Sequence, residues 1–255
     1  MTTPTVTTVT IAGKRHYEHP ITRQQVPSVT SIIGVLDKPA LPRWAAKEVA
    51  AFAVGNKASW VNLPDDAAHD MLKSAPWRMR DKAADTGTNA HSILEQFALH
   101  GVPTFFPPDV PQSVISGLAE FWLTFQPHVI ACEQTVWNST IGYAGSFDLI
   151  AIINGKTTLI DLKTGAGVYG STALQLAAYA KGEEIITADG TTIAMPVVEA
   201  YAVLHVPQNG KPWALVPMDV TDQEFNAFMM ARGLFAWVTH REKPVVGKRT
   251  RKVAA

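Results

Sequence analysis

Two aspartates and one lysine in the 255-residue chain flank a dipeptide that predicts how their side chains are arranged. Asn154-Gly155 strongly favours a two-residue type I′ hairpin because both positions tolerate a positive φ. Such a turn fixes the register of the strands that it joins, so Asp148 is expected directly opposite Asp161, with Cβ atoms ~4.5–5.5 Å apart. Lys163 follows Asp161 by two residues and therefore lies on the same face of the sheet. Three ionisable groups should meet on one hydrophobic hairpin.

Apolar residues flank both aspartates, so the two charges should repel unless one pKa rises or a cation neutralises them. Carboxylate oxygens at this spacing suit Mg²⁺ or Mn²⁺, with water and a substrate phosphate completing the coordination shell. A lysine beside such an ion can hold or deprotonate an attacking water. The pattern therefore favours metal-assisted hydrolysis of a phosphodiester. It is equally compatible with Lys163 bridging two surface acids.

Four ordered motifs resemble the signatures of one enzyme superfamily. They are Gly87-Thr-Asn-Ala-His-Ser-Ile-Leu-Glu95, Gly145-Ser-Phe-Asp148, Ile160-Asp-Leu-Lys-Thr-Gly165 and Gln175-Leu-Ala-Ala-Tyr179. In this order they resemble the motifs of the PD-(D/E)XK nucleases, and most of all the RecB-type exonuclease branch with its small phage-encoded exonucleases. The resemblance spans about residues 78–206, and a weaker similarity extends to the N-terminal segment.

The resemblance implies a metal site with named ligands. His91, Asp148 and Asp161 would ligate one or two Mg²⁺ or Mn²⁺ ions, and the backbone carbonyl of Leu162 would add another oxygen. Lys163 would be the catalytic lysine. These roles come from the resemblance, whereas the residues alone predict only the convergence of the two aspartates and the lysine.

Three further side chains receive roles from the same resemblance. Gln175 and Tyr179 lie one helical turn apart and so share a face, which implies a role near the DNA end or in holding the site. Glu95 lies one turn after His91 and would serve a second ion or orient water, although a helix-surface carboxylate fits equally well. Glu133 lies on a predicted strand that leads to the site. The sequence does not decide whether its side chain faces the site, and Glu133 is not among the predicted site residues.

Basic side chains in two segments are candidate contacts for DNA. Arg78 and Arg80, with nearby lysines and Trp77, could grip phosphates and stack a base, although a solvated charged helix face is an equally simple interpretation. Residues 241–252 carry six Lys or Arg against one Glu, within a chain of 22 basic and 22 acidic residues. This tail is expected to be flexible and to add salt-sensitive attraction for DNA.

Composition excludes several other classes of protein. A hydrophobic share of 47% excludes a disordered chain, and a single cysteine, Cys132, excludes an internal disulfide and a cysteine-bound iron–sulfur cluster. Because the phosphate-loop pattern is absent, ATP is not expected as a cofactor. The chain has neither a signal peptide pattern nor an apolar run of ~18 residues. We therefore expect no membrane contact and a cytoplasmic protein, in a bacterial host cell if the chain is phage-encoded.

The elements that must position these residues predict an α/β (α+β) fold. The fold implied is a restriction-endonuclease-like core with a central mixed β-sheet flanked by helices, plus N-terminal helical elements. The expected domains are an N-terminal hairpin and helices packed on the core (1–80), the nuclease core (81–241) and the basic tail (242–255). Strands are predicted at 5–11, 15–19, 129–137, 143–153, 156–163 and 197–206, and helices at 27–36, 43–54, after Pro64, and at 89–99, 114–125, 171–181 and 221–240.

Taken together, the sequence predicts a metal-dependent DNA exonuclease that hydrolyses phosphodiester bonds at single-stranded or double-stranded ends, in phage or bacterial recombination, repair or replication. A recombination or single-strand-binding protein is a possible partner. Two alternatives stay open. One is an endonuclease on the same fold, and the other is a non-catalytic DNA-binding recombination partner that has lost turnover.

Overall fold

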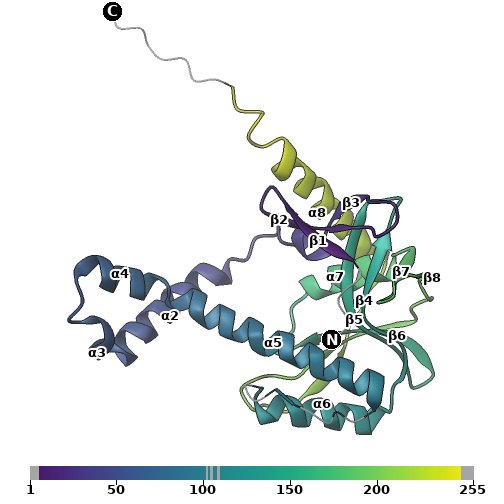
Figure 1. Ribbon diagram of the computed structural model, residues 1–255, viewed down its shortest axis with the longest axis horizontal. Helices are drawn as coiled ribbons and strands as arrows, with labels where there is room; N and C mark the ends of the chain where they lie inside the picture. The colour runs from purple at the N-terminus through teal and green to yellow at the C-terminus, as the bar shows by residue number, and fades with distance from the viewer. Residues whose placement is uncertain (1–5, 102, 104–105, 108–109, 248–255) are drawn as a thin grey trace, which may run out of the picture.

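A seven-stranded mixed sheet holds the residues that the sequence singles out. The computed structural model describes residues 6–101, 103, 106–107 and 110–247 (Figure 1). Within them the strand order is β10-β9-β6-β5-β4-β7-β8, and β6 and β9 are the parallel pair in an otherwise antiparallel sheet. The strands are β4 (His128–Asn138), β5 (Tyr143–Ile153), β6 (Lys156–Lys163), β7 (Glu184–Ile186), β8 (Thr192–Ala194), β9 (Ala200–His205) and β10 (Ala214–Pro217). The predicted α+β class with a mixed central sheet is confirmed.

The hairpin between β5 and β6 forms as predicted. Asn154 and Gly155 have φ values of 50° and 77°, as a type I′ turn requires. The two strands pair from Ile153 with Lys156 to Leu149 with Ile160, in the predicted register. The turn sequence therefore sets which residues of β5 and β6 lie side by side.

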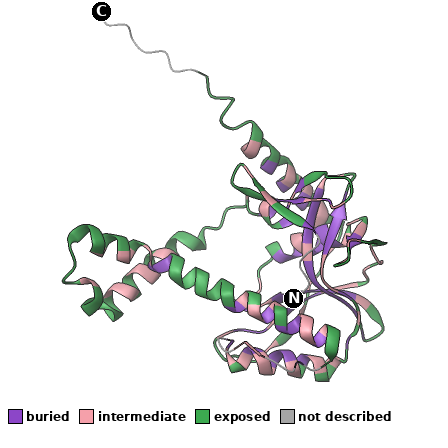
Figure 2. Cartoon of the chain, viewed as in Figure 1, coloured by how far each residue is buried: buried purple, intermediate pink, exposed green. Residues whose placement is uncertain are grey.

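Helices cover both faces of the sheet (Figures 1 and 2). Ile150 and Leu159 contribute to the core under α1 (Val29–Ile33), α7 (Ser171–Ala180) and α8 (Asp222–His240). Leu149 and Ile160, on the opposite face, pack with α5 (Ala75–His100) and α6 (Gln112–Phe125). A sheet that is buried on both faces needs apolar residues at consecutive positions, which explains the nearly continuous hydrophobic runs of β5 and β6.

A three-stranded sheet formed by the N-terminal residues packs beside the larger one. It contains β1 (Thr7–Ile11), β2 (Lys14–Glu18) and β3 (Gln25–Pro27), in that order. Its apolar side chains join Trp137 of β4 in a separate small core. The predicted N-terminal hairpin is confirmed for β1 and β2, whereas Thr5 lies outside the described residues.

Helices α2 (Ala40–Gly55), α3 (Lys57–Trp60) and α4 (Asp65–Lys73) form an arm that extends away from the sheets (Figure 1). None of the residues in these three helices is buried, and they contact one another and α5 (Figure 2). The sequence predicted helices here but placed them on the core. They lie outside it because they pack on the start of α5, a helix of 26 residues and about 39 Å whose first turns extend beyond the sheet. The expected domain boundary after residue 80 falls within this helix.

The last helix begins at a capping box in which Thr221 and Glu224 satisfy each other's backbone N–H groups. Residues 242–247 follow it in exposed turns. The remainder of the predicted basic tail, residues 248–255, lies outside the described residues. No helix within the described part of the chain is long and apolar enough to cross a bilayer.

Replacing Gly155 by alanine should destabilise the protein, because the φ of 77° is unfavourable for a residue with a Cβ. The cost comes from the backbone conformation alone, since no atom lies within 4 Å of the added Cβ. We expect Gly155→Ala to lower the free energy of unfolding by about 1 kcal/mol and the Tm by ~2–4 °C. Gly167→Ala, in an open loop without a positive φ, is the matched control and should change stability by less than ~0.5 kcal/mol. Equal effects of the two variants in urea unfolding would contradict the turn assignment.

Candidate metal centre

Three acidic side chains lie next to one another across strands β4, β5 and β6. Asp148 is at the middle of the row, on β5. The register of β4 places Glu133 beside it, and the register of β6 places Asp161 on the other side. Asp148 and Asp161 are buried, with exposed fractions of 6% and 2%. The sheet thus concentrates carboxylates at a point where water cannot screen their charges well.

The backbone of Glu133 is strained at this point. Its φ is 50°, in the left-handed region that side chains other than glycine rarely adopt. Such a conformation costs on the order of 1–3 kcal/mol and persists where the surrounding structure imposes it, often at functional sites. Here the strained residue is the one whose carboxylate meets His91.

Helix α5 adds His91 to the row of carboxylates. Its Nδ1 lies 2.9 Å from Glu133 Oε1 and 3.5 Å from Asp148 Oδ1. The ligating atoms of His91, Glu133 and Asp148 all lie within 4.8 Å of one another, close enough for one ion to touch all three. Carboxylates with one imidazole suit Mn²⁺, and Mg²⁺ accepts the carboxylates with water in the remaining positions. The donor set therefore fits a divalent cation of this kind.

Asp161 is held by a lysine from its own strand and a glutamine from α7. Lys163 Nζ lies 2.6 Å from Asp161 Oδ2, and Gln175 Nε2 donates to Asp161 Oδ1 at 2.9 Å. The same amide contacts the hydroxyl of Tyr179 at 3.2 Å. Oδ1 of this buried acid accepts a hydrogen bond, whereas Oδ2 faces the ammonium of Lys163 in an ion pair without forming a hydrogen bond to a described residue.

Asp148 receives a different partner from β6. The backbone N–H of Leu162 donates to Asp148 Oδ2 at 2.6 Å. The carbonyl of Leu162, which the resemblance assigned to the metal, stays a prediction, and the structure shows that the amide of the same residue contacts the site. The amide fixes the carboxylate of Asp148 so that its other oxygen faces His91.

The glycine of the second motif has a steric role. A Cβ added to Gly145 would lie 2.6 Å from a ring carbon of Tyr179, closer than real side chains approach. Tyr179 is buried directly over β5 at this position, and its hydroxyl lies beside Gln175. The absence of a side chain at Gly145 is therefore what lets α7 bring Gln175 to Asp161.

Burial dominates the electrostatics of the two aspartates. It raises the pKa of Asp148, which the charge of His91 only partly offsets. Burial and the neighbouring charge of Asp148 raise the pKa of Asp161 to about 6, despite the contact with Lys163. Burial alone would lower the pKa of His91, but the charge of Asp148 and the hydrogen bond with Glu133 raise it to about 9. The imidazolium thus acts as a counter-ion for the acids in the metal-free protein.

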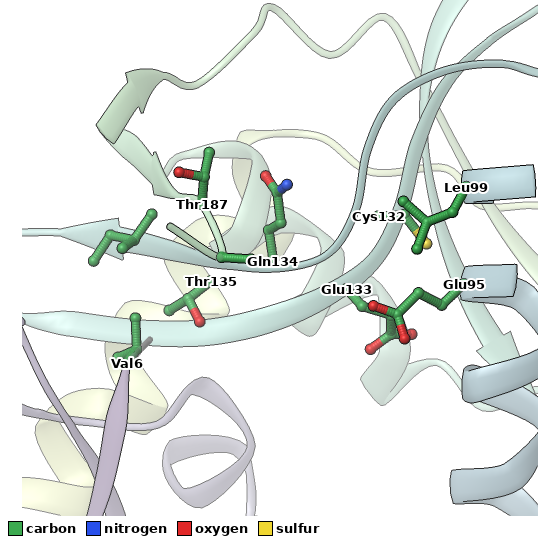
Figure 3. A pocket seen from close by; sticks show the side chains of 10 residues that line it. Val6, Glu95, Leu99, Cys132, Glu133, Gln134, Thr135 and Thr187 are labelled. Carbon is green, nitrogen blue, oxygen red and sulfur yellow. The ribbon is translucent and has the colours of Figure 1, made fainter. Parts of the chain in front are cut away.

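Glu95 lies next to the site, whereas the two predicted DNA-contact arginines do not. Glu95 is one turn beyond His91, and it lines the same pocket as Glu133 (Figure 3). Arg78 donates to the carbonyl of Met71 at 3.1 Å, and Arg80 pairs with Asp81 at 2.7 Å. Both arginines lie near the start of α5, where it contacts the arm, roughly 16–20 Å along the helix from His91. They cannot contact a substrate group at the metal centre, and a contact with more distant DNA stays a prediction.

Glu133 is the site residue that sequence reasoning left out. Its place beside Asp148 depends on the register of β4 against β5, which a four-residue connection and a bulge near Ile130 establish. Unlike Asn154-Gly155, this connection has no sequence signal that fixes the pairing. The acid could have been found only through its position on a strand next to the site.

No protein-family model matches the chain, and no curated protein matches it either. The candidate metal centre therefore rests on the geometry described above.

The protonation of His91 offers a direct test of this arrangement. In NMR titration of the metal-free protein, the ring should titrate near pH 9, and Glu133→Gln should lower its pKa by removing one partner. Because the folded pKa exceeds the unfolded value of 6.5, the contribution of this group to stability should be full below pH 6.5 and lost as the pH rises through 9. Glu242→Gln, at an exposed residue, is the control. An unchanged His91 pKa in the Glu133 variant would contradict the contact.

Proposed function

We propose that this protein is a divalent-metal-dependent nuclease on a restriction-endonuclease-like core, hydrolysing phosphodiester bonds of DNA at its ends. The observation that carries the proposal is the meeting of His91 with the row of carboxylates on β4, β5 and β6, with Lys163 at its end. Buried like charges next to one another are costly, and proteins retain them where a cation or a proton-transfer step requires them.

His91, Glu133 and Asp148 would hold the ion, and Asp161 lies beside this group as a further carboxylate. When bound, a divalent ion polarises a phosphoryl oxygen and lowers the pKa of a water molecule. Mg²⁺ and Mn²⁺ match the mixture of carboxylates and imidazole. Before it can ligate, the ring of His91 must give up its proton, so metal binding and proton release should be linked.

Lys163 is the side chain of the site best placed to act on the reacting groups. Its side chain is 37% exposed while that of Asp161 is 2% exposed, so the ammonium lies between a buried carboxylate and solvent. Its remaining N–H groups can donate to an attacking water or to a phosphoryl oxygen. Asp161 orients this ammonium and Gln175 holds Asp161 in place, which makes Gln175 a positioning residue.

The acidic centre does not attract a polyanion by itself, so DNA must be held by charges elsewhere. The basic residues between 241 and 252 and the arginines near the start of α5, Arg78 and Arg80, offer sequence-independent contacts with phosphates. We therefore expect binding that weakens steeply with salt. A preference for ends, and a partner that delivers them in recombination, belong to the same proposal.

Removing the lysine or its aspartate should abolish cleavage without unfolding the protein. With end-labelled linear and closed circular DNA and Mg²⁺ or Mn²⁺, Lys163→Ala should lower the rate by ~10²–10⁴-fold, and Asp161→Asn should be comparably impaired. Lys156→Ala, at the exposed start of the same strand, is the matched control and should retain full activity. Undiminished digestion by both site variants would refute the mechanism. Cleavage of circles would identify an endonuclease, and DNA binding without hydrolysis a non-catalytic module.

Metal affinity should rise with pH because His91 must lose its proton to become a ligand. Mn²⁺ binding followed by calorimetry should strengthen between pH 6 and pH 9, with protons released to the buffer. His91→Ala should weaken binding and remove most of this pH dependence, whereas Glu242→Gln should leave both unchanged. Equal Mn²⁺ affinity across this pH range in the wild-type protein would show that His91 is not a ligand.

A further inference from the structure

A pocket of about 220 Å³ opens beside the metal centre (Figure 3). Glu95 and Glu133 line one end of it. Gln134 and Thr187 extend from β4 and from the segment after β7, away from that end. Since Glu133 also belongs to the proposed metal ligands, whatever occupies this pocket adjoins a group bound at the ion.

The pocket exists because β4 is only partly covered on this side. Strand β7 pairs with β4 through Thr135–Trp137 and no further towards its start. The residues of β4 before Thr135 therefore lie at an uncovered edge, flanked by Leu99 near the end of α5 and by the connection between β7 and β8. An uncovered strand edge offers backbone donors and acceptors to a ligand.

Away from the two glutamates, the lining suits a neutral and partly apolar group. Val6, Leu99 and Ile186 supply apolar walls, and Gln134 and Thr135 supply hydrogen-bonding groups. Among the described residues that line the pocket none is basic and two are acidic, so the charge of this lining disfavours a phosphate. The carbonyl oxygen of the Gln134 side chain is buried without a hydrogen-bond partner, and rotation of this amide would let it pair with a ligand.

The volume of the pocket suits a single ring. A closed cavity of ~150 Å³ holds one benzene molecule, so an open pocket of about 220 Å³ has room for one heterocycle with part of its sugar. A flat ring with a hydrogen-bonding edge and apolar faces matches both the walls and the polar groups. A nucleobase has this chemistry.

We infer that the pocket receives the base and sugar of the nucleotide adjoining the scissile phosphate. This inference rests on the proposed nuclease activity and adds a specificity-determining subsite to it. The scissile phosphate would lie at the metal centre, and the nucleoside would extend along the uncovered edge of β4. Leu99 would pack against this nucleoside, and Gln134 would form a hydrogen bond with it.

Blocking the pocket should impair substrate binding while leaving the metal centre intact. Leu99 is 63% exposed, so Leu99→Trp can add bulk at the pocket without disturbing the core. Leu123→Trp, at a 72% exposed leucine of α6 that does not line the pocket, is the matched control. We expect Leu99→Trp to lower kcat/KM at least tenfold, mainly through KM, with Mn²⁺ affinity unchanged, and the control to stay within twofold.

A substrate with an abasic residue next to the scissile bond identifies what the pocket binds. The wild-type protein and Leu123→Trp should cleave it at least fivefold less efficiently than normal DNA, whereas Leu99→Trp and Gln134→Ala should show a smaller difference. Binding of deoxyadenosine to the metal-free protein, followed by NMR, should weaken in Leu99→Trp. The subsite is refuted if the wild-type protein cleaves DNA and Leu99→Trp cleaves normal and abasic DNA with the same efficiencies as the wild-type protein. If the wild-type protein cleaves no DNA, the proposed function fails, and deoxyadenosine binding alone then decides whether the pocket accepts a nucleoside.

Discussion

Carboxylates packed side by side in a buried part of the sheet are the constraint on which the rest of the structure depends. Each needs a compensating group, and each receives one from another element. His91 comes from α5, the amide of Leu162 from β6 and the amide side chain of Gln175 from α7. Helices therefore stabilise the sheet in two ways at once, by burying its apolar faces and by placing polar partners beside its acids. Loss of the α5 contact would remove the charged partner of Asp148, and an unpaired buried charge is more costly than an absent hydrogen bond. Loss of the α7 contact would leave Asp161 with Lys163 as its remaining partner.

Close packing at one position connects these two roles. Tyr179 occupies the space over Gly145, so α7 approaches β5 more closely than a side chain there would permit. The hydroxyl of Tyr143 donates to the carbonyl of Ala178 at 2.8 Å and fixes the same helix from below. With α7 held at these two points, the amide of Gln175 reaches Asp161. The surroundings of Asp161 on β6 thus depend on the small size of Gly145 on the neighbouring strand β5.

The sequence predicts the parts of this site that depend on local rules. Asn154-Gly155 determines the register of β5 and β6, and the placement of Lys163 beside Asp161 follows from strand alternation. The parts that it misses depend on long-range packing. Glu133 joins the site through a strand pairing that no turn signal specifies, and the extension of the arm depends on α5 continuing past residue 80. Strands β7, β8 and β10 are only three or four residues long and partly exposed, too short for a hydrophobic pattern to show.

The connection between α5 and β6 explains why His91 can serve as a fixed ligand although its helix also carries the arm. The side chain of Gln208 donates to the carbonyl of Ala83 at 3.3 Å and to the hydroxyl of Thr164 at 3.1 Å. It therefore ties α5 to the end of β6 just before the buried half of the helix begins. The exposed arm lies before this tie, whereas the turn that carries His91 packs on the sheet, where Ala90, Ile93 and Leu94 are buried. Since the proposed metal site requires rigidly placed ligands, the packing of this turn on the sheet suits that role.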